Sequence, residues 1–487
     1  MANIETLASR PGLLRQLGFY SATALVISNM IGTGIFATTG YMAGDLGSAG
    51  LILACWGVGA LFALAGALTY SELGINFPSS GGEYVYLTNA FGPEWGFMTG
   101  WVSFFAGFSA PIAAAALVFS DYLGHFFPSL QLASATTVLG SHIFRLRLLH
   151  GQLAPVTGRL GGVLDAIFSL RLGPGQIVAS CLIAGFTILN CFGLGRTAKV
   201  QNALTSTKLM VLAGFLLLGF TVGTGSWSHF AQPAVRTSTV GLPTQFFVSL
   251  LWVMVGYSGW NAATYVAEEI RRPERTLPLA LGAGTAVVAL LYLGLNVIYI
   301  YATPLEQLKG KTAVGALSAS NLFGPGVAGV FAILMALCIV STVSAEVTIG
   351  PRVYYAMAKN KAFFGAAANV HPRWHTPVVA ILSQGLCAMV MTLISFRNLL
   401  TYIGMSLTLF TALSAAALIV FRRTRPGWQR LRALDFAWPL IPVSYIAMGA
   451  AMMVYGVIQE PVVSLAAFGT VGIGAAIYRF GVRAPRA

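Results

Sequence analysis

Long apolar segments recur along almost the whole chain, each close to or above 20 residues, and short polar connections separate them. A helix needs about 20 apolar residues to cross the hydrocarbon core of a bilayer. The pattern therefore predicts an all-α membrane protein. We predict twelve transmembrane helices, near 17–43, 48–76, 94–119, 176–194, 203–223, 242–269, 277–301, 324–357, 376–395, 398–421, 436–457 and 462–480.

The composition agrees with this class, because 56% of the residues are hydrophobic and only 9% are charged. If the N-terminus lies in the cytoplasm, the connections on that side carry the larger share of the 28 lysines and arginines. This bias predicts that both termini are cytoplasmic. It also accounts for the net charge of +14 without a nucleic-acid partner.

The spans divide the chain into four parts. Residues 1–16 form a cytoplasmic N-terminal segment, and 17–223 form a first five-helix half that contains an extracellular insertion at 121–175. Residues 224–421 form a second five-helix half, and 422–487 hold two additional helices and a cytoplasmic tail.

Two predicted spans contain glycines at their centres. The first contains "SNMIGTGIF" and the sixth contains "VGYSGWNAATY". Glycine costs a helix about 1 kcal/mol relative to alanine, and unpaired backbone groups are costlier still in lipid. Breaks five spans apart are typical of two inverted five-helix repeats that bind a substrate between them. The alternative is that these glycines only let helices pack closely.

Longer motifs around these breaks resemble a known group of transporters. "IGTGIF", "SELGINFPSSGGEYVYLTNAFG", "GYSGWNAATYVAEEIRRPERTLPLA" and "PRVYYAMAKNKAFFGAAANVHPRWHTPV" are similar to the amino acid–polyamine–organocation (APC) superfamily, most closely its L-type amino acid transporter (LAT) branch. The resemblance implies a LeuT-type fold, with spans one to five and six to ten as inverted repeats. It also implies a sodium-independent exchanger of neutral amino acids that works by alternating access. A proton-coupled symporter of amino acids, or a transporter of cationic amino acids or polyamines, is the alternative.

The resemblance also implies which residues bind the substrate. Backbone N–H groups at the first break would hold the substrate carboxylate, and carbonyl groups at both breaks would hold its ammonium. Asn261 would steady the unwound sixth span, and Val255 stands where relatives often carry a bulky aromatic gate. The predicted substrate-binding residues are Met30, Gly32, Thr33, Gly34, Ile35, Val255, Ser258 and Asn261.

Two ionisable residues lie within predicted spans, Lys208 in the fifth and Glu346 in the eighth. Both are about 7–9 Å inside the cytoplasmic boundary at 1.5 Å per helical residue. Lys208 resembles a fifth-span lysine that replaces a coupling cation in sodium-independent relatives, whereas a snorkelling lysine is the alternative. Glu346 could pair with Lys208, and the alternatives are a pair with the nearby Arg352 or a polar pocket.

Other functional classes fit the sequence poorly. None of the six histidines lies in the core of a span, and paired acids are almost absent there, so we predict no enzyme, no metal site and no cofactor. Broken helices favour a carrier over a channel. The expected partners are an amino acid and the lipid bilayer. The resemblance implies that heteromeric members of the LAT branch are joined to a heavy chain through an extracellular cysteine. The stretch 121–175 lacks cysteine, so we expect no disulfide-linked heavy chain and a bacterial inner (plasma) membrane as the location.

Overall fold

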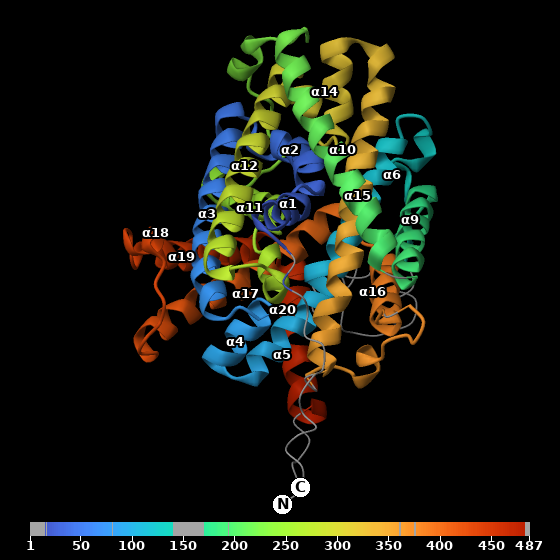
Figure 1. Ribbon diagram of the computed structural model, residues 1–487. Helices are drawn as coiled ribbons and strands as arrows, with labels where there is room; N and C mark the ends of the chain where they lie inside the picture. The colour runs from blue at the N-terminus through green and yellow to red at the C-terminus, as the bar shows by residue number, and fades with distance from the viewer. Residues whose placement is uncertain are drawn as a thin grey trace, which may run out of the picture.

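The computed structural model describes residues 15, 17–79, 81–139, 170–192, 194–359, 362–374 and 376–482. Nearly all regular structure in these ranges is helical (Figure 1). Ten of the described helical segments are long and apolar enough to cross a membrane, by length and composition. The predicted sixth and ninth spans contain shorter apolar helices, Leu242–Gly256 and Val378–Met391.

The first group of helices runs from Phe19 to Thr221. In chain order they are α1 (Phe19–Met30), α2 (Thr33–Leu46), α3 (Ala49–Asn76), α4 (Glu83–Phe91), α5 (Pro93–Val102), the π-helical η2 (Ser103–Ser109), α6 (Ala110–Leu123), the 3-10 turns η3 (Pro128–Leu130) and η4 (Leu132–Ser134), α9 (Pro174–Cys191) and α10 (Leu194–Thr221).

The second group runs from Trp227 to Val482 and opens with a short 3-10 turn. They are η5 (Trp227–Ala231), α11 (Leu242–Gly256), η6 (Ala262–Glu269), α12 (Pro273–Ala302), α13 (Leu305–Leu308), α14 (Val314–Phe323), α15 (Pro325–Lys359), η7 (Gly365–Ala368), α16 (Val378–Met391), α17 (Phe396–Thr424), α18 (Arg432–Asp435), α19 (Leu440–Gln459), α20 (Pro461–Ile477) and η8 (Tyr478–Val482).

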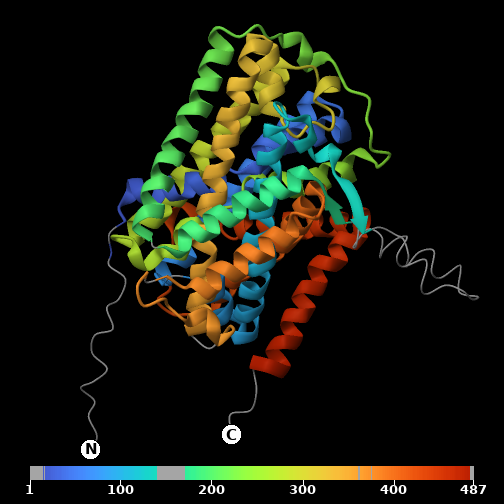
Figure 2. The same cartoon turned by 90° about the vertical axis from the view of Figure 1, so that its right-hand side faces the viewer.

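One element departs from the all-α prediction. Strand β1 (Thr136–Leu139) pairs with β2 (Leu170–Leu172) in a small antiparallel sheet, visible as arrows at the side of the bundle in Figure 2. The pairing brings together two ends of the predicted insertion at 121–175. Most of that insertion lies outside the described residues.

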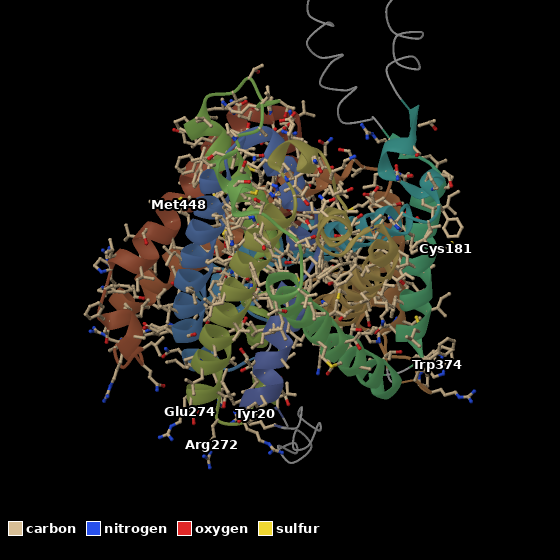
Figure 3. The ribbon with its side chains drawn as sticks, turned by 90° about the horizontal axis from the view of Figure 1, so that it is seen from above. Tyr20, Cys181, Arg272, Glu274, Trp374 and Met448 are labelled. Carbon is tan, nitrogen blue, oxygen red and sulfur yellow. The ribbon has the colours of Figure 1, made fainter. Side chains whose placement is uncertain are left out.

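The two helices of the first span, α1 and α2, lie in the middle of the bundle with α11 (Figure 1). Helix α11 packs against α2 and α3, and α12 packs along α3 and α1. On the other side α15 packs against α6 and α10. Apolar side chains are exposed at the rim of the bundle: Tyr20 lies at the periphery in Figure 3 and is 86% exposed. Exposed apolar side chains around the rim are what a lipid-facing surface requires.

The chain before α1 is joined to the chain after η6. Leu17 and Ile270 form a parallel β-bridge, and the Arg271 N–H donates to the Leu17 carbonyl at 2.8 Å. Figure 3 shows Tyr20 beside Arg272 and Glu274 at the same edge of the bundle. The beginning of the first span and the end of the sixth are thus tied together by backbone hydrogen bonds.

A buried ion pair joins α3 to α17. Both carboxylate oxygens of Glu72 accept from the Arg422 guanidinium, at 2.6 and 2.5 Å. The indole of Trp428 and the backbone N–H of Leu431 complete the shell at 2.8 and 2.9 Å. Because Glu72 is fully buried, its charge depends on these donors. The contact is not apparent from the sequence, because Glu72 and Arg422 are 350 residues apart in the chain.

Candidate functional site

The first span is interrupted as predicted. Helix α1 ends at Met30 and α2 begins at Thr33, with Ile31 and Gly32 outside helical geometry. The N–H groups at the start of α2, those of Thr33, Gly34 and Ile35, have no acceptor within their own helix. They carry a positive partial charge, which suits a carboxylate.

The sixth span is interrupted at the corresponding place. Helix α11 ends at Gly256, and after a turn the chain continues as the 3-10 segment η6. Gly259 in this turn has φ of +96°, and a β-carbon built on it would lie 2.8 Å from backbone atoms of Asn29. The two interrupted segments therefore touch each other directly, and only glycine fits between them.

Helix packing, and not only the approach of a ligand, explains why residue 34 is glycine. A β-carbon on Gly34 would lie only 2.2 Å from the α-carbon of Gly256. The close-packing alternative therefore applies at this position, where the backbones of α2 and α11 are in contact. Gly32 has more room, because its β-carbon would meet nothing closer than the Thr342 methyl group at 3.4 Å.

Lys208 binds the carbonyl groups at the first break. Its ammonium donates to the Ile31 carbonyl at 2.6 Å and to the Thr342 hydroxyl at 3.0 Å, with the Ser28 carbonyl at 3.5 Å. The side chain is fully buried, so the snorkelling alternative is wrong in this structure. The Thr342 hydroxyl itself donates to Ile31 at 2.9 Å. One cation thus joins α10, the break and α15.

Glu346 is in neither of its predicted pairs here. Among the described residues no nitrogen of Lys208 or Arg352 lies within 4 Å of its carboxylate. Its Oε2 atom is buried and has no hydrogen-bond donor in the described part of the chain. Lys208 acts on it only across a longer distance. Glu346 is therefore a carboxylate without a contacting cation.

Two of the carbonyls predicted to bind the substrate ammonium already accept hydrogen bonds. The Met30 carbonyl accepts from the Tyr292 hydroxyl at 2.5 Å. The Val255 carbonyl accepts from the Ser258 N–H at 3.1 Å and the Ser258 hydroxyl at 2.7 Å. A carbonyl oxygen has two lone pairs, so Met30 can accept one further bond, whereas Val255 must first release one. The predicted ammonium role thus needs Ser258 to rotate away.

A cavity of about 90 Å³ lies beside the sixth-span break. Of the predicted residues, Val255, Ser258, Asn261 and Glu346 line it. The predicted residues of the first break and Lys208 are not part of the lining, and they are largely buried. Aromatic side chains form much of the rest of the lining, namely Phe62, Phe108, Trp260, Tyr265 and Tyr445.

Glu83 is a lining residue that the sequence analysis quoted but gave no role. It begins α4, and its Oε1 accepts from the Asn261 amide at 2.5 Å and the Tyr70 hydroxyl at 3.0 Å. The Asn261 amide also donates to the Tyr265 hydroxyl at 3.1 Å. Burial raises the pKa of Glu83 above its usual range, and the polar groups of Tyr265, Tyr70 and Asn261 oppose this rise. Its place in the otherwise uncharged stretch "FPSSGGEYVYL" was the available signal.

Asn261 connects the unwound segment to α4. Its side chain fixes the unwound segment to α4 through Glu83, while its carbonyl accepts from the Thr264 hydroxyl at 2.7 Å. The end of the break is thus connected to an element outside both broken spans.

The chain is similar in sequence to known proteins over most of its length. The profile of the family described as amino acid permease matches residues 17–474. The chain is 28% identical over 474 residues to the human large neutral amino acids transporter small subunit 2, covering 96% of this chain and 79% of that protein. It is 25% identical to the serine/threonine exchanger SteT of Bacillus subtilis, covering 90% of each chain. It is also 25% identical to the mouse b(0,+)-type amino acid transporter 1, covering 92% of this chain and 84% of that protein.

Proposed function

Because the chain belongs to the amino acid permease family, we propose that it is a sodium-independent amino acid transporter that exchanges substrates by alternating access. The observation that carries this proposal is the ammonium of Lys208 at the first break. It donates to carbonyl oxygens, which are the ligands that sodium-coupled carriers offer to a cation at an unwound helix. A fixed positive charge at that place removes the need for a sodium ion.

The proposal includes the arrangement predicted from the sequence. Twelve spans follow if α11 with η6 and α16 are added to the ten longer segments, and the breaks at Ile31–Gly32 and Tyr257–Asn261 support two inverted five-helix repeats. The repeats would be 17–223 and 224–421. Both termini would be cytoplasmic in a bacterial inner membrane, with no enzymatic activity and no disulfide-linked heavy chain. All five cysteines are free thiols.

The break geometry supports a way of moving. Leu17 and Ile270 join the start of the first span to the end of the sixth, so we propose that these two ends swing together when the site opens to the cytoplasm. The contact between Gly34 and Gly256 would hold the other two halves together during that motion. Rigid-body motion of one group of helices around a central site is typical of such carriers.

Reconstitution tests the proposal. Purified full-length protein in liposomes should take up radiolabelled amino acid when unlabelled amino acid is inside, and the rate should not change when choline replaces sodium. Lys208→Met should lose this exchange, whereas Lys359→Met, an exposed lysine at the end of α15, should keep it. Uptake that requires sodium, or that proceeds equally from empty liposomes, would refute sodium-independent exchange.

Proton-coupled uptake is the second candidate, and Glu83 is the observation that favours it. A buried carboxyl with a raised pKa that lines the cavity could take up and release a proton during transport. An imposed inward proton gradient in the same liposomes distinguishes the two. Accumulation of substrate without internal amino acid would replace exchange by symport.

A further inference from the structure

Glu346 lines the cavity beside the sixth-span break, and its carboxylate has no contacting partner among the described residues. It lines the same cavity as Val255, Ser258 and Asn261, and its Oε2 atom is buried without a hydrogen bond. An ionised carboxylate in such a place is strongly unfavourable unless donors or a cation approach it. Something that enters the cavity can supply them.

The neighbouring charges do not supply them. The Lys208 ammonium is committed to Ile31 and Thr342. The other carboxylate of the cavity, Glu83, is satisfied by Asn261 and Tyr70. Among the described residues that line the cavity there is no lysine, arginine or histidine.

Protonation of Glu346 would not remove the problem. A protonated carboxyl becomes a hydrogen-bond donor and needs an acceptor, yet Oε2 has no polar neighbour within hydrogen-bond distance in the described part of the chain. A proton on Oε2 would therefore be a buried donor without an acceptor, which is unfavourable. A ligand cation instead brings both charge and donors.

The position of Glu346 suits the far end of a bound amino acid. Thr342, which contacts Lys208 and Ile31 at the break, precedes Glu346 by four residues on α15. The two side chains therefore share a face of the helix and are separated by about 6 Å along it. If the amino acid's α-carboxylate and α-ammonium are held at the break, a side chain of four methylene groups spans a comparable distance. The cavity aromatics Phe108 and Tyr265 can face its cation.

We propose that Glu346 binds the positively charged end of the substrate side chain, so that the protein carries cationic amino acids such as lysine or ornithine. The inference rests on the proposed function, since it takes the cavity to be the substrate site of an amino acid exchanger. It selects the cationic class that the sequence analysis kept as an alternative over the neutral class. Glu346 is then a specificity-determining residue.

Norleucine provides the test, because it has an unbranched side chain like that of lysine but without the ammonium. Full-length protein in liposomes loaded with lysine exchanges it for external radiolabelled lysine, and unlabelled lysine or norleucine competes. Lysine should compete at about tenfold lower concentration than norleucine or better, as expected for a charged hydrogen bond in a buried site.

Two substitutions and a control test whether Glu346 causes the preference for lysine over norleucine. Glu346→Gln should raise the half-inhibitory concentration of lysine by about 10- to 100-fold while that of norleucine changes little. Glu346→Asp keeps the charge and should retain a preference for lysine. The control is Glu274→Gln, which removes an exposed carboxylate at the start of α12 and should change neither value. If Glu346→Gln abolishes exchange, thermal stabilisation of the purified variants by lysine and by norleucine gives the same comparison.

The outcomes separate this inference from the proposed function. Active exchange of leucine and norleucine with no preference for lysine would overturn the cationic specificity and leave the exchanger intact. Equal loss of lysine and norleucine in Glu346→Gln would also overturn it, by showing that the residue acts on the conformation. So would neutral amino acid uptake driven by a proton gradient and abolished by Glu346→Gln. Absence of any amino acid exchange would refute the proposed function itself.

Discussion

Replacing Gly34 by alanine tests whether the two broken spans hold each other by backbone contact. The added β-carbon would lie 2.2 Å from the Gly256 α-carbon. Because β-carbons in folded proteins do not come closer than about 3.0 Å to other heavy atoms, α2 and α11 must separate by roughly 0.8 Å. Overpacking of this kind costs about 1–3 kcal/mol. The obstacle is main chain and cannot rotate away, so we expect the upper end.

The helix propensity of alanine works in the opposite direction. Alanine stabilises a helix by about 1 kcal/mol relative to glycine, so the net destabilisation by Gly34→Ala should be about 2 kcal/mol. Gly32→Ala is a matched control in the same break, since its β-carbon would make an ordinary contact at 3.4 Å. Gly32 has an extended backbone with φ of −126°, which alanine adopts without strain.

The measurement is the apparent melting temperature of each variant in one detergent, followed by exchange in liposomes. Gly34→Ala should melt well below the parent protein and below Gly32→Ala, and its exchange should fall. If Gly34→Ala melts at or above the parent, the gain in helix propensity is the dominant effect. The close contact of α2 with α11 would then not be a property of the folded protein.

Four further substitutions address the buried charges. Lys208→Met and Glu346→Gln, with the double variant, should show a coupling energy far below the 3–5 kcal/mol lost when a buried ion pair is broken; a larger value would mean that the residues pair in another state. Glu83→Gln should flatten the pH dependence of stability. Because the pKa of Glu83 is raised, the folded state binds more protons than the unfolded state, so stability falls as pH rises above the usual carboxyl pKa. Thermal unfolding from pH 4 to 8 measures this, and an unchanged dependence of melting temperature on pH in Glu83→Gln would contradict it. Glu72→Gln should destabilise by about 3–5 kcal/mol by leaving a buried arginine under-satisfied, and a parental melting temperature would contradict it.

The membrane character and the helix breaks were predictable from local pattern. Runs of apolar residues predict the membrane-spanning segments. Gly32 and Gly259 mark the places where the sequence predicts that two of these helices are interrupted. The breaks at Ile31–Gly32 and Tyr257–Asn261 confirm that reading. The resemblance led us to expect that Lys208 replaces a coupling cation, and its contacts with the Ile31 carbonyl and the Thr342 hydroxyl are compatible with that role.

Contacts between distant segments were not predictable in this way. Glu83 and Asn261 are 178 residues apart in the chain, and Glu72 and Arg422 are 350 apart. A single sequence gives no indication that such residues meet. The small sheet of β1 and β2 was missed for the same reason, because its strands are short and flank a long insertion.

Lys208 and Glu346 show that similar depth in the membrane does not predict whether two side chains contact each other. Both were placed at similar depth, which made them natural partners in a low-dielectric interior. Depth does not fix the direction in which a side chain points around its helix. Thr342 and Glu346 share a face of α15, yet Lys208 bonds to the former at 3.0 Å and makes no ion pair with the latter. The ammonium binds at the break because the Ile31 carbonyl is not engaged within a helix. The carbonyls inside a regular helix already accept hydrogen bonds from their own helix and would not offer such an acceptor. Glu346 faces the cavity instead, which is the position that our proposal of a preference for cationic substrates depends on.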